Sequence, residues 1–301
     1  MHSRIDELNF CDLSPTDKSL WQNYQAADPS LASPYFSVAY FEAVERVRPG
    51  IKVLRFFEKE RVAAFWPIRK GPMGTARPVA GTMDDLHGII AHPSIRLELT
   101  QDAVRQHIGG YAFSAVPYSQ RRHGLHGQHG DGNQVMDLSR GHKAWLEQRS
   151  ADSANFRREW RKARKLIDAD TTLIQHDVID PVSFHRLIEL KQDAYAQSGH
   201  FDIFSLDWPK ALLQALLESG DDGARGILST LKIDGEIAAI CYSMRSQTCL
   251  HYWFPAYEAG FAKLKPGLAL LFSLAYSCKF LIVFLKLTSD RPSTISSSCS
   301  D

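Results

Sequence analysis

The sequence predicts an α/β protein made of two copies of one α-α-β-β unit. The chain has 301 residues, of which 44% are apolar and 23% charged, so it can fold as a soluble globular protein of one large or two ordinary domains. The order helix, helix, strand, strand occurs twice. The segments "VAAF" (62–65) and "IAAI" (237–240) hold the same place in the two series, 175 residues apart. A repeated order of elements indicates a repeated structural unit.

The first series occupies the N-terminal quarter of the chain. Residues 15–28 and 36–47 have the apolar spacing of amphipathic helices. The segments "IKVLRFF" (51–57) and "RVAAFWPI" (61–68) flank a charged turn at 58–60, which predicts a β-hairpin.

A histidine-containing segment, "SQRRHGLHGQHGDGN" (119–133), lies between the two series. His123, His126 and His129 are three residues apart, a spacing that raises the possibility of a metal site. The four glycines of this segment favour a solvated loop, because a metal site needs a rigid frame with supporting hydrogen bonds.

A strongly basic segment, "NFRREWRKARKL" (155–166), follows a predicted strand "QVMDL" and a helix that we expect Ser139 to cap. Four apolar residues form one helical stripe: Phe156, Trp160, Ala163 and Ile167. One face should therefore dock while six cations face outward, in a chain whose net charge is only +1. This face is either simply solvated or an anion contact, and arginine suits phosphate and carboxylate groups. Our substrate-binding candidates here are Arg157, Arg161 and Arg164.

The second series starts at Asp180, a good N-cap, with Pro181 at the first helical position. The helix that follows carries Lys191 and Tyr195, two further substrate-binding candidates. A helix at "SLDWPKALLQALLES" precedes a second hairpin, "GILSTLKI" and "IAAICYSM", joined by "DGE".

A third strand, "CLHYWFPA" (249–256), leads through a short loop into a long helix. A helix N-terminus presents free backbone N–H groups, and two lysines stand beside this one, so a phosphate could bind there. Neither a Walker loop nor the dinucleotide G-x-G-x-x-G pattern is present, whereas a pyrophosphate-bearing acyl carrier such as coenzyme A would fit. An ordinary strand-to-helix loop is the alternative. The cofactor-binding candidates are Lys263, Lys265, Pro266 and Gly267.

Four segments together resemble the GNAT-type acyltransferases associated with cellulose biosynthesis, the CelD-like proteins, which are related to the FemAB-like transferases. They are "NFRREWRKARKL", "LIELKQDAYAQSG", "LKIDGEIAAICYSM" and "YWFPAYEAGFAKLKPGLALL". The resemblance is clearest over residues 150–278 and weaker over 15–138. It implies an α/β (α+β, GNAT-like) fold of two tandem acyl-CoA N-acyltransferase-like halves, 1–138 and 139–287. Residues 288–301, rich in serine, are expected to be a disordered tail.

The resemblance implies direct acyl transfer from an acyl-CoA such as acetyl-CoA, without a metal, to an amine or hydroxyl acceptor. The acceptor would be a small or saccharide-linked molecule of polysaccharide or cell-envelope biosynthesis, and DNA is not an expected partner. Candidates for the acid and base are His251, Tyr252 and Glu258. Because neighbours in a strand face opposite sides, at most one of His251 and Tyr252 points into the cleft. The alternatives are a catalytically degenerate scaffold protein and a FemAB-like transferase that uses aminoacyl-tRNA.

Two features depart from the resembled family. Lys265 stands where the family usually has a serine before Pro-Gly. Family members also continue beyond the long helix with a strand carrying aspartate and glycines and with a tyrosine-lysine pair, whereas here "KFLIVFLKLTSDRPSTISSSCSD" follows. We therefore expect the second half to be incomplete at its C-terminus, with an exposed apolar strand edge that favours oligomers or aggregates.

The expected location is the cytoplasm. The start "MHSRIDELNF" has no apolar leader, and the five scattered cysteines form no C-x-x-C pair. Residues 267–287 are long enough to cross a bilayer, but Lys279 lies near the middle, and the stretch also reads as a helix followed by a buried strand. Membrane association is expected only if this stretch acts as an anchor.

Overall fold

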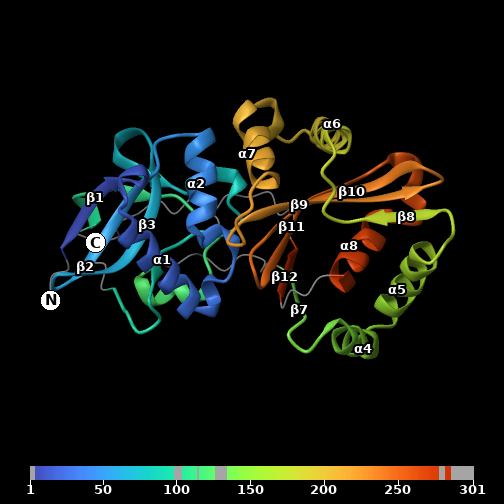
Figure 1. Ribbon diagram of the computed structural model, residues 1–301, viewed down its shortest axis with the longest axis horizontal. Helices are drawn as coiled ribbons and strands as arrows, with labels where there is room; N and C mark the ends of the chain where they lie inside the picture. The colour runs from blue at the N-terminus through green and yellow to red at the C-terminus, as the bar shows by residue number, and fades with distance from the viewer. Residues whose placement is uncertain (1–3, 98–103, 114, 126–133, 278–281, 286–301) are drawn as a thin grey trace, which may run out of the picture. The chain divides into compact units, whose positions relative to one another are not determined.

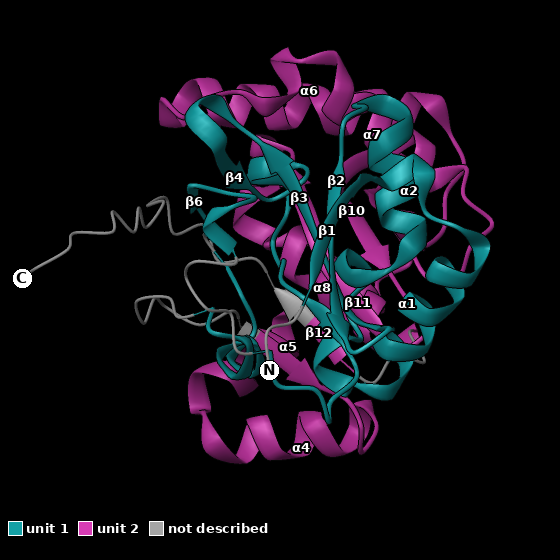
Figure 2. Ribbon diagram, turned by 90° about the vertical axis from the view of Figure 1, so that its left-hand side faces the viewer, with its two compact units in different colours: residues 1–132, 288–301 teal, residues 133–287 magenta. Residues whose placement is uncertain are grey.

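The computed structural model describes residues 4–97, 104–113, 115–125, 134–277 and 282–285. The described residues form two compact units, one within residues 1–132 (unit 1) and one within 133–287 (unit 2), each with its own β-sheet (Figure 2). The mixed α/β class predicted from the sequence is confirmed. The predicted disordered tail, residues 288–301, and Lys279 lie outside the described residues.

Unit 1 contains a sheet in the order β1-β2-β3-β4-β6, with β5 also paired to β3. Its strands and α-helices are β1 (Ile5–Asn9), α1 (Pro15–Ala27), α2 (Val38–Val47), β2 (Lys52–Glu58), β3 (Arg61–Lys70), β4 (Thr75–Arg77), β5 (Ile90–Ala91) and β6 (Gly110–Tyr111). The two predicted helices and the predicted hairpin are all present. Helix α1 begins at a capping box in which Ser14 and Asp17 satisfy each other's backbone N–H groups.

Unit 2 contains a sheet in the order β7-β12-β11-β10-β9-β8, in which only the β11–β12 pair is parallel among the described strands. Its elements are β7 (Gln134–Asp137), α4 (His142–Asp152), α5 (Ala154–Ile167), β8 (Thr172–Gln175), α6 (Pro181–Ser198), α7 (Asp207–Leu217), β9 (Arg225–Ile233), β10 (Glu236–Arg245), β11 (Cys249–Tyr257), α8 (Pro266–Ser277) and β12 (Ile282–Leu285). Helices α6 and α7 lie on one side of this sheet, and α5 and α8 on the other (Figure 1).

The internal repeat is visible in a shared β-bulge. In both hairpins one alanine near the turn has no partner residue on the facing strand: Ala63 in β3 and Ala238 in β10. These alanines hold the same position in the "VAAF" and "IAAI" segments. The flanking pairs are Phe57↔Val62 and Phe56↔Ala64 in unit 1, and Lys232↔Ile237 and Leu231↔Ala239 in unit 2. Because a bulge fixes the local bend and twist of its strand, the four-residue echo marks a repeated structural feature.

The third strand differs between the two units. In unit 2, β11 pairs with β10 as far as Tyr257. In unit 1 the corresponding strand is split into β4 and β5, and residues 78–89 leave the sheet between them. Pro67 lies in the stretch of β3 that this excursion bypasses. Proline has no N–H to donate, so a continuous ladder is disfavoured there.

The start of α4 differs from the prediction. We expected Ser139 to cap α4, which was wrong: Gly141, at φ 87°, occupies that position, and the Ser139 N–H donates to the Asp137 carboxylate at 2.9 Å. The hydrogen bond from Ser139 to Asp137 closes a local turn, and Gly141 adopts the positive φ of the N-cap position at little cost. Helix α5 is capped by Ser153, whose hydroxyl accepts the Phe156 N–H at 3.2 Å.

The apolar stretch 267–287 forms a helix and then a strand. Helix α8 is 12 residues long and the strand β12 follows it, as predicted. Strand β12 pairs with β11 on one side and with β7 on the other, so the exposed edge expected at this strand was wrong for its described residues. Among the described helices of the chain, none is both long and apolar enough to span a bilayer.

Candidate functional site

The candidate site of unit 2 is built around β11. Strand β12 pairs with β11 from Cys249 to Tyr252, whereas β10 follows β11 to Tyr257. The register between β10 and β11 shifts between Tyr242 and Ser243, which leaves Trp253 as the extra residue of a bulge. A bulge bends its strand, and this one lies directly after the last described pair with β12. The bulge therefore bends β11 between its pairing with β12 and the segment that leads toward α8.

Tyr252 joins β11 to the first turn of α8. Its side chain is buried, and its hydroxyl donates a hydrogen bond to the Gly267 carbonyl at 3.1 Å. Burial raises the pKa of Tyr252 well above its ordinary value, so the phenol keeps its proton at neutral pH. His251, also buried, precedes it in the strand and faces the α6 side of the sheet because strand neighbours alternate.

Glu258 follows β11 and is held by two contacts. Its N–H donates to the Ala238 carbonyl at 3.0 Å, and its carboxylate accepts a hydrogen bond from Arg186 Nε at 2.6 Å. Arg186 lies on α6 and also donates to Glu189 at 2.8 Å. Glu258 is thus tied to the α6 side of the sheet, whereas the Tyr252 hydroxyl contacts α8.

A short 3₁₀ helix (Ala259–Leu264) and Lys265 connect β11 to α8. Lys265 is in the left-handed region, at φ 51° and ψ 50°, and its carbonyl accepts the N–H groups of Leu268 and Ala269. It therefore caps α8 with its backbone, while Pro266 begins the helix. The side chains of Lys263 and Lys265 are both exposed, and Lys265 Nζ lies 2.5 Å from a Glu159 carboxylate oxygen of α5.

Helix α5 docks through its apolar stripe, as the sequence predicted, and the structure shows that its partner is α8. The Trp160 and Phe156 rings meet Phe272 edge-on, with centroids 5.1 and 5.7 Å away, and Ala163 is buried. The arginines on the outer face are exposed and make local contacts: Arg157 donates to the Ser150 carbonyl, Arg161 to the Arg157 carbonyl, and Arg164 to Asp168.

The structure separates the predicted site residues into two groups. The α5 arginines, Tyr252 and the loop residues Lys263 to Gly267 lie on the α5–α8 side of the sheet. Lys191 and Tyr195 lie on α6, on the other side, with Lys191 Nζ 5.2 Å from the centroid of the Tyr195 ring.

His176 was missed by the sequence analysis. It follows β8, and its ring nitrogens lie 3.0 Å from Ser229 Oγ on β9 and 3.2 Å from Ser273 Oγ on α8. Burial lowers its pKa, so the imidazole is neutral at pH 7. Along the chain, Ser229 is 53 residues and Ser273 is 97 residues from His176, so no local sequence pattern could have revealed this cluster.

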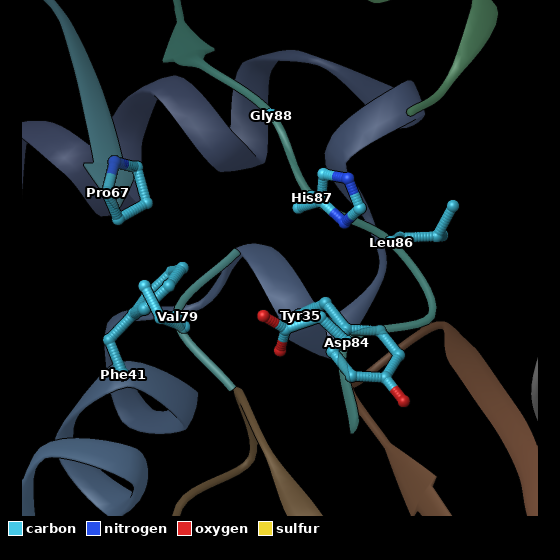
Figure 3. Close-up of a pocket in the computed structure, with 8 residues that line it drawn as sticks. All are labelled: Tyr35, Phe41, Pro67, Val79, Asp84, Leu86, His87 and Gly88. Atoms are coloured by element: carbon cyan, nitrogen blue, oxygen red, sulfur yellow. The ribbon is translucent and has the colours of Figure 1, made fainter. Parts of the chain in front are cut away.

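Unit 1 has a small cavity beneath the 78–89 excursion, with room for about one water molecule (Figure 3). Asp84 is buried there and accepts hydrogen bonds from the Tyr40 hydroxyl at 2.5 Å and the Ala80 N–H at 2.8 Å. Burial raises its pKa to about 7. His87 is also buried, neither ring nitrogen has a hydrogen-bond partner among the described residues, and burial lowers its pKa to about 3.

The histidine segment before unit 2 is only partly described. His123 is fully buried rather than solvated, and its Nε2 lies 3.0 Å from Arg122 Nε. His126 and His129 lie outside the described residues.

Comparisons with known proteins agree with this geometry. Residues 151–279 match a sequence model of the acetyltransferase (GNAT) domain. This range contains α5, β11, α8 and the segment Lys263 to Gly267, which we call the lysine loop. No curated protein matches the chain.

Three solved structures are similar to this chain at low identity. A crystal structure of FemX has a TM-score of 0.61 and 11% identity, over 97% of this chain and 91% of that one. A tandem GNAT protein from the clavulanic acid biosynthesis pathway has a TM-score of 0.54 and 12% identity, over 96% and 91%. The C-terminal domain of a putative lysylphosphatidylglycerol synthetase from Agrobacterium fabrum has a TM-score of 0.53 and 11% identity, over 90% and 77%.

These findings establish the fold. The chain has a mixed α/β GNAT-like fold with two sheets in tandem halves, as predicted, and residues 151–279 match the sequence model of the acetyltransferase (GNAT) domain. The narrower relation to CelD-like proteins of cellulose biosynthesis stays a prediction.

Proposed function

We propose that unit 2 transfers an acyl group from an acyl-CoA, such as acetyl-CoA, to an amine or hydroxyl acceptor. One observation carries the proposal: β11 has a bulge at Trp253, and the same strand leads through two exposed lysines into the N-terminus of α8. Strand β11, the two lysines and α8 all lie in the range 151–279 that matches the GNAT domain.

The arrangement suits a ligand with an anionic end and an extended amide-bearing arm. The pyrophosphate would lie at the first turn of α8, at the positive end of the helix dipole, where Lys263 and Lys265 add positive charge. The arm would then run beside β11 beyond Tyr252, as an added strand does at a sheet edge. A backbone N–H of β11 would hold the thioester oxygen and stabilise the tetrahedral intermediate.

The chemistry needs one proton removed and one returned. The acceptor amine attacks the thioester carbon, the C–S bond breaks, and the thiolate leaves with a proton. Tyr252 is our candidate acid because its buried phenol stays protonated at neutral pH and lies beside the first turn of α8. Glu258 is our candidate base, held in place by Arg186, and His251 is the remaining candidate.

The acceptor is expected to be a small or saccharide-linked molecule of polysaccharide or cell-envelope biosynthesis. Anionic groups would meet the outer face of α5 at Arg157, Arg161 and Arg164. On the opposite side of the sheet, Lys191 and Tyr195 would contact an acceptor that approaches past α6.

An aminoacyl-tRNA donor is the second candidate. The basic outer face of α5 and the overall likeness to FemX favour it, whereas the net charge of +1 does not. A scaffold protein of the same fold without turnover is the third, and it predicts no affinity for either donor.

Titration calorimetry with acetyl-CoA tests the proposal. The double change Lys263→Ala and Lys265→Ala should weaken binding by about 1.5–3 kcal/mol for each charged hydrogen bond lost. Its melting temperature should hardly change because both side chains are exposed. A charge-matched control replaces Lys143 on α4 and Lys210 on α7. Equal acetyl-CoA affinity in both double variants would exclude the lysine loop as the binding site of the pyrophosphate. Wild-type protein that binds charged tRNA but not acetyl-CoA would favour the second candidate.

A further inference from the structure

A single carboxylate lies among the cations at the start of α8. Glu159 is the only acidic residue of α5, and one of its oxygens lies 2.5 Å from Lys265 Nζ. Arg158 Nε and Lys162 Nζ each lie 3.6 Å from its other oxygen. The Glu159 side chain is 13% exposed, whereas those of Arg158, Lys162 and Lys265 are 63%, 61% and 54% exposed. Three solvent-facing cations thus cover one carboxylate.

The surroundings keep this carboxylate charged. Its hydrogen bond with Lys265 is the largest cause that lowers the pKa of Glu159, and the charges of Lys162 and Arg158 act in the same direction. The pair is also structurally well placed, because α5 is docked by Trp160, the residue after Glu159, and Lys265 is the residue that caps α8. The carboxylate therefore stays beside the helix terminus without relying on a flexible loop of its own.

We propose that Glu159 competes with the phosphate groups of the ligand for Lys265 and thereby lowers the affinity of this site for them. In the unliganded protein Glu159 neutralises Lys265, the lysine that would otherwise contact a phosphate. A phosphate that binds must draw Lys265 away from Glu159 and approach a negative charge that stays in place. This inference rests on the proposed function, because it concerns the same acyl-CoA site.

The opposite role makes the opposite prediction. If Glu159 served to orient Lys265 toward the ligand, its removal would free the lysine chain and weaken binding. If it competes with the ligand, its removal leaves Lys265 available and abolishes the repulsion, so binding becomes tighter. Exposed ion pairs have small net energies, so we expect a tightening of about three- to tenfold at low salt.

The test compares wild-type protein with Glu159→Gln, which keeps the shape of the side chain and removes its charge. Calorimetry with CoA and with adenosine 3′,5′-bisphosphate is performed at about 50 mM and 500 mM salt, since the Debye length shortens several-fold over this range. We expect tighter binding of both ligands at low salt and a much smaller difference at high salt. In a Lys265→Ala background the increase in affinity caused by Glu159→Gln should be smaller, because the substitution then removes only the repulsion between the carboxylate and the phosphate.

The matched control is Glu147→Gln on α4, which makes the same change in net charge at a side chain that is 68% exposed and 4.0 Å from Lys143. It should leave CoA affinity unchanged. Wild-type protein that binds CoA while Glu159→Gln binds it equally or more weakly would overturn the inference and leave the proposed function standing. If neither protein binds CoA, the proposed function fails, and this inference fails with it.

Discussion

Replacing Asp84 by Asn should stabilise unit 1 in alkaline solution and give little benefit in acid. Asp84 is 4% exposed and accepts hydrogen bonds from the Tyr40 hydroxyl and the Ala80 N–H. Asparagine can keep both contacts: its carbonyl accepts the Ala80 N–H, and its NH₂ group donates to the Tyr40 oxygen. The substitution therefore removes the buried charge and largely preserves the packing.

The magnitude follows from proton linkage. Burial raises the pKa of Asp84 from 3.8 in the unfolded chain to about 7 in the folded chain. Ionisation is therefore harder in the folded state, so this carboxyl lowers stability as pH rises from about 4 to 7, and the loss is complete above pH 7. At about 1.4 kcal/mol for each unit of pKa shift, the largest possible loss of stability from this ionisation is about 4 kcal/mol. We expect Asp84→Asn to raise the free energy of unfolding by about 1–3 kcal/mol at pH 8, because the rearranged hydrogen bonds offset part of the largest possible gain.

Urea denaturation at pH 4.5 and pH 8 measures this effect as the difference between variant and wild type. The comparison cancels groups that titrate alike in both proteins, including His87, whose lowered pKa removes stability as pH falls below about 6.5. Asp152→Asn, an exposed carboxylate at the end of α4, is the control and should show no pH-dependent gain. A gain for Asp84→Asn that is equal at the two pH values would refute the reasoning, because it could not come from a buried ionisation.

Two further outcomes are expected in unit 2. Trp160→Ala should lower the free energy of unfolding by about 2–3 kcal/mol, less than for a fully buried ring, because Trp160 is half-buried against Phe272. Thermal melts measure this against Arg161→Ala, an exposed neighbour that should cost little, and equal melting temperatures would show that the α5 stripe is not docked. Tyr252→Phe should lower kcat for acyl transfer and leave the acyl-CoA affinity nearly unchanged, with a stability loss of about 0.5–1.5 kcal/mol for the lost bond to Gly267. An unchanged kcat would remove Tyr252 as the acid.

Local patterns in the sequence were sufficient for much of the fold. Helix α6 begins at Pro181 with Asp180 as its cap, because that side chain accepts the N–H groups of Val182 and Ser183. The turn of the second hairpin was visible in "DGE", since Asp234 and Gly235 both adopt positive φ there. The docked stripe of α5 follows from its helical spacing. The "VAAF" and "IAAI" segments indicated the repeat, and the structure added the bulge at their first alanine.

Short and polar strands could not be read in this way. Strand β1 is half-buried along its whole length, and β8 alternates between half-buried and exposed residues, so neither shows a strong apolar pattern. Each is fixed by the neighbour with which it pairs. Strand β7 was predicted as a strand and assigned to the N-terminal half, 1–138, and it pairs with β12 in the second sheet, about 150 residues away along the chain.

The sequence by itself thus determined the repeat, the main helices and hairpins, and the lysine-bearing loop before α8. Only the tertiary structure decided what those lysines contact, because Glu159 and Lys265 are 106 residues apart. The same holds for Asp84 with Tyr40, 44 residues apart, and for His176 with Ser273. Periodicity and capping are properties of neighbours along the chain. Ion pairing, burial and the pKa changes that they cause depend on which distant residues the packed core brings together.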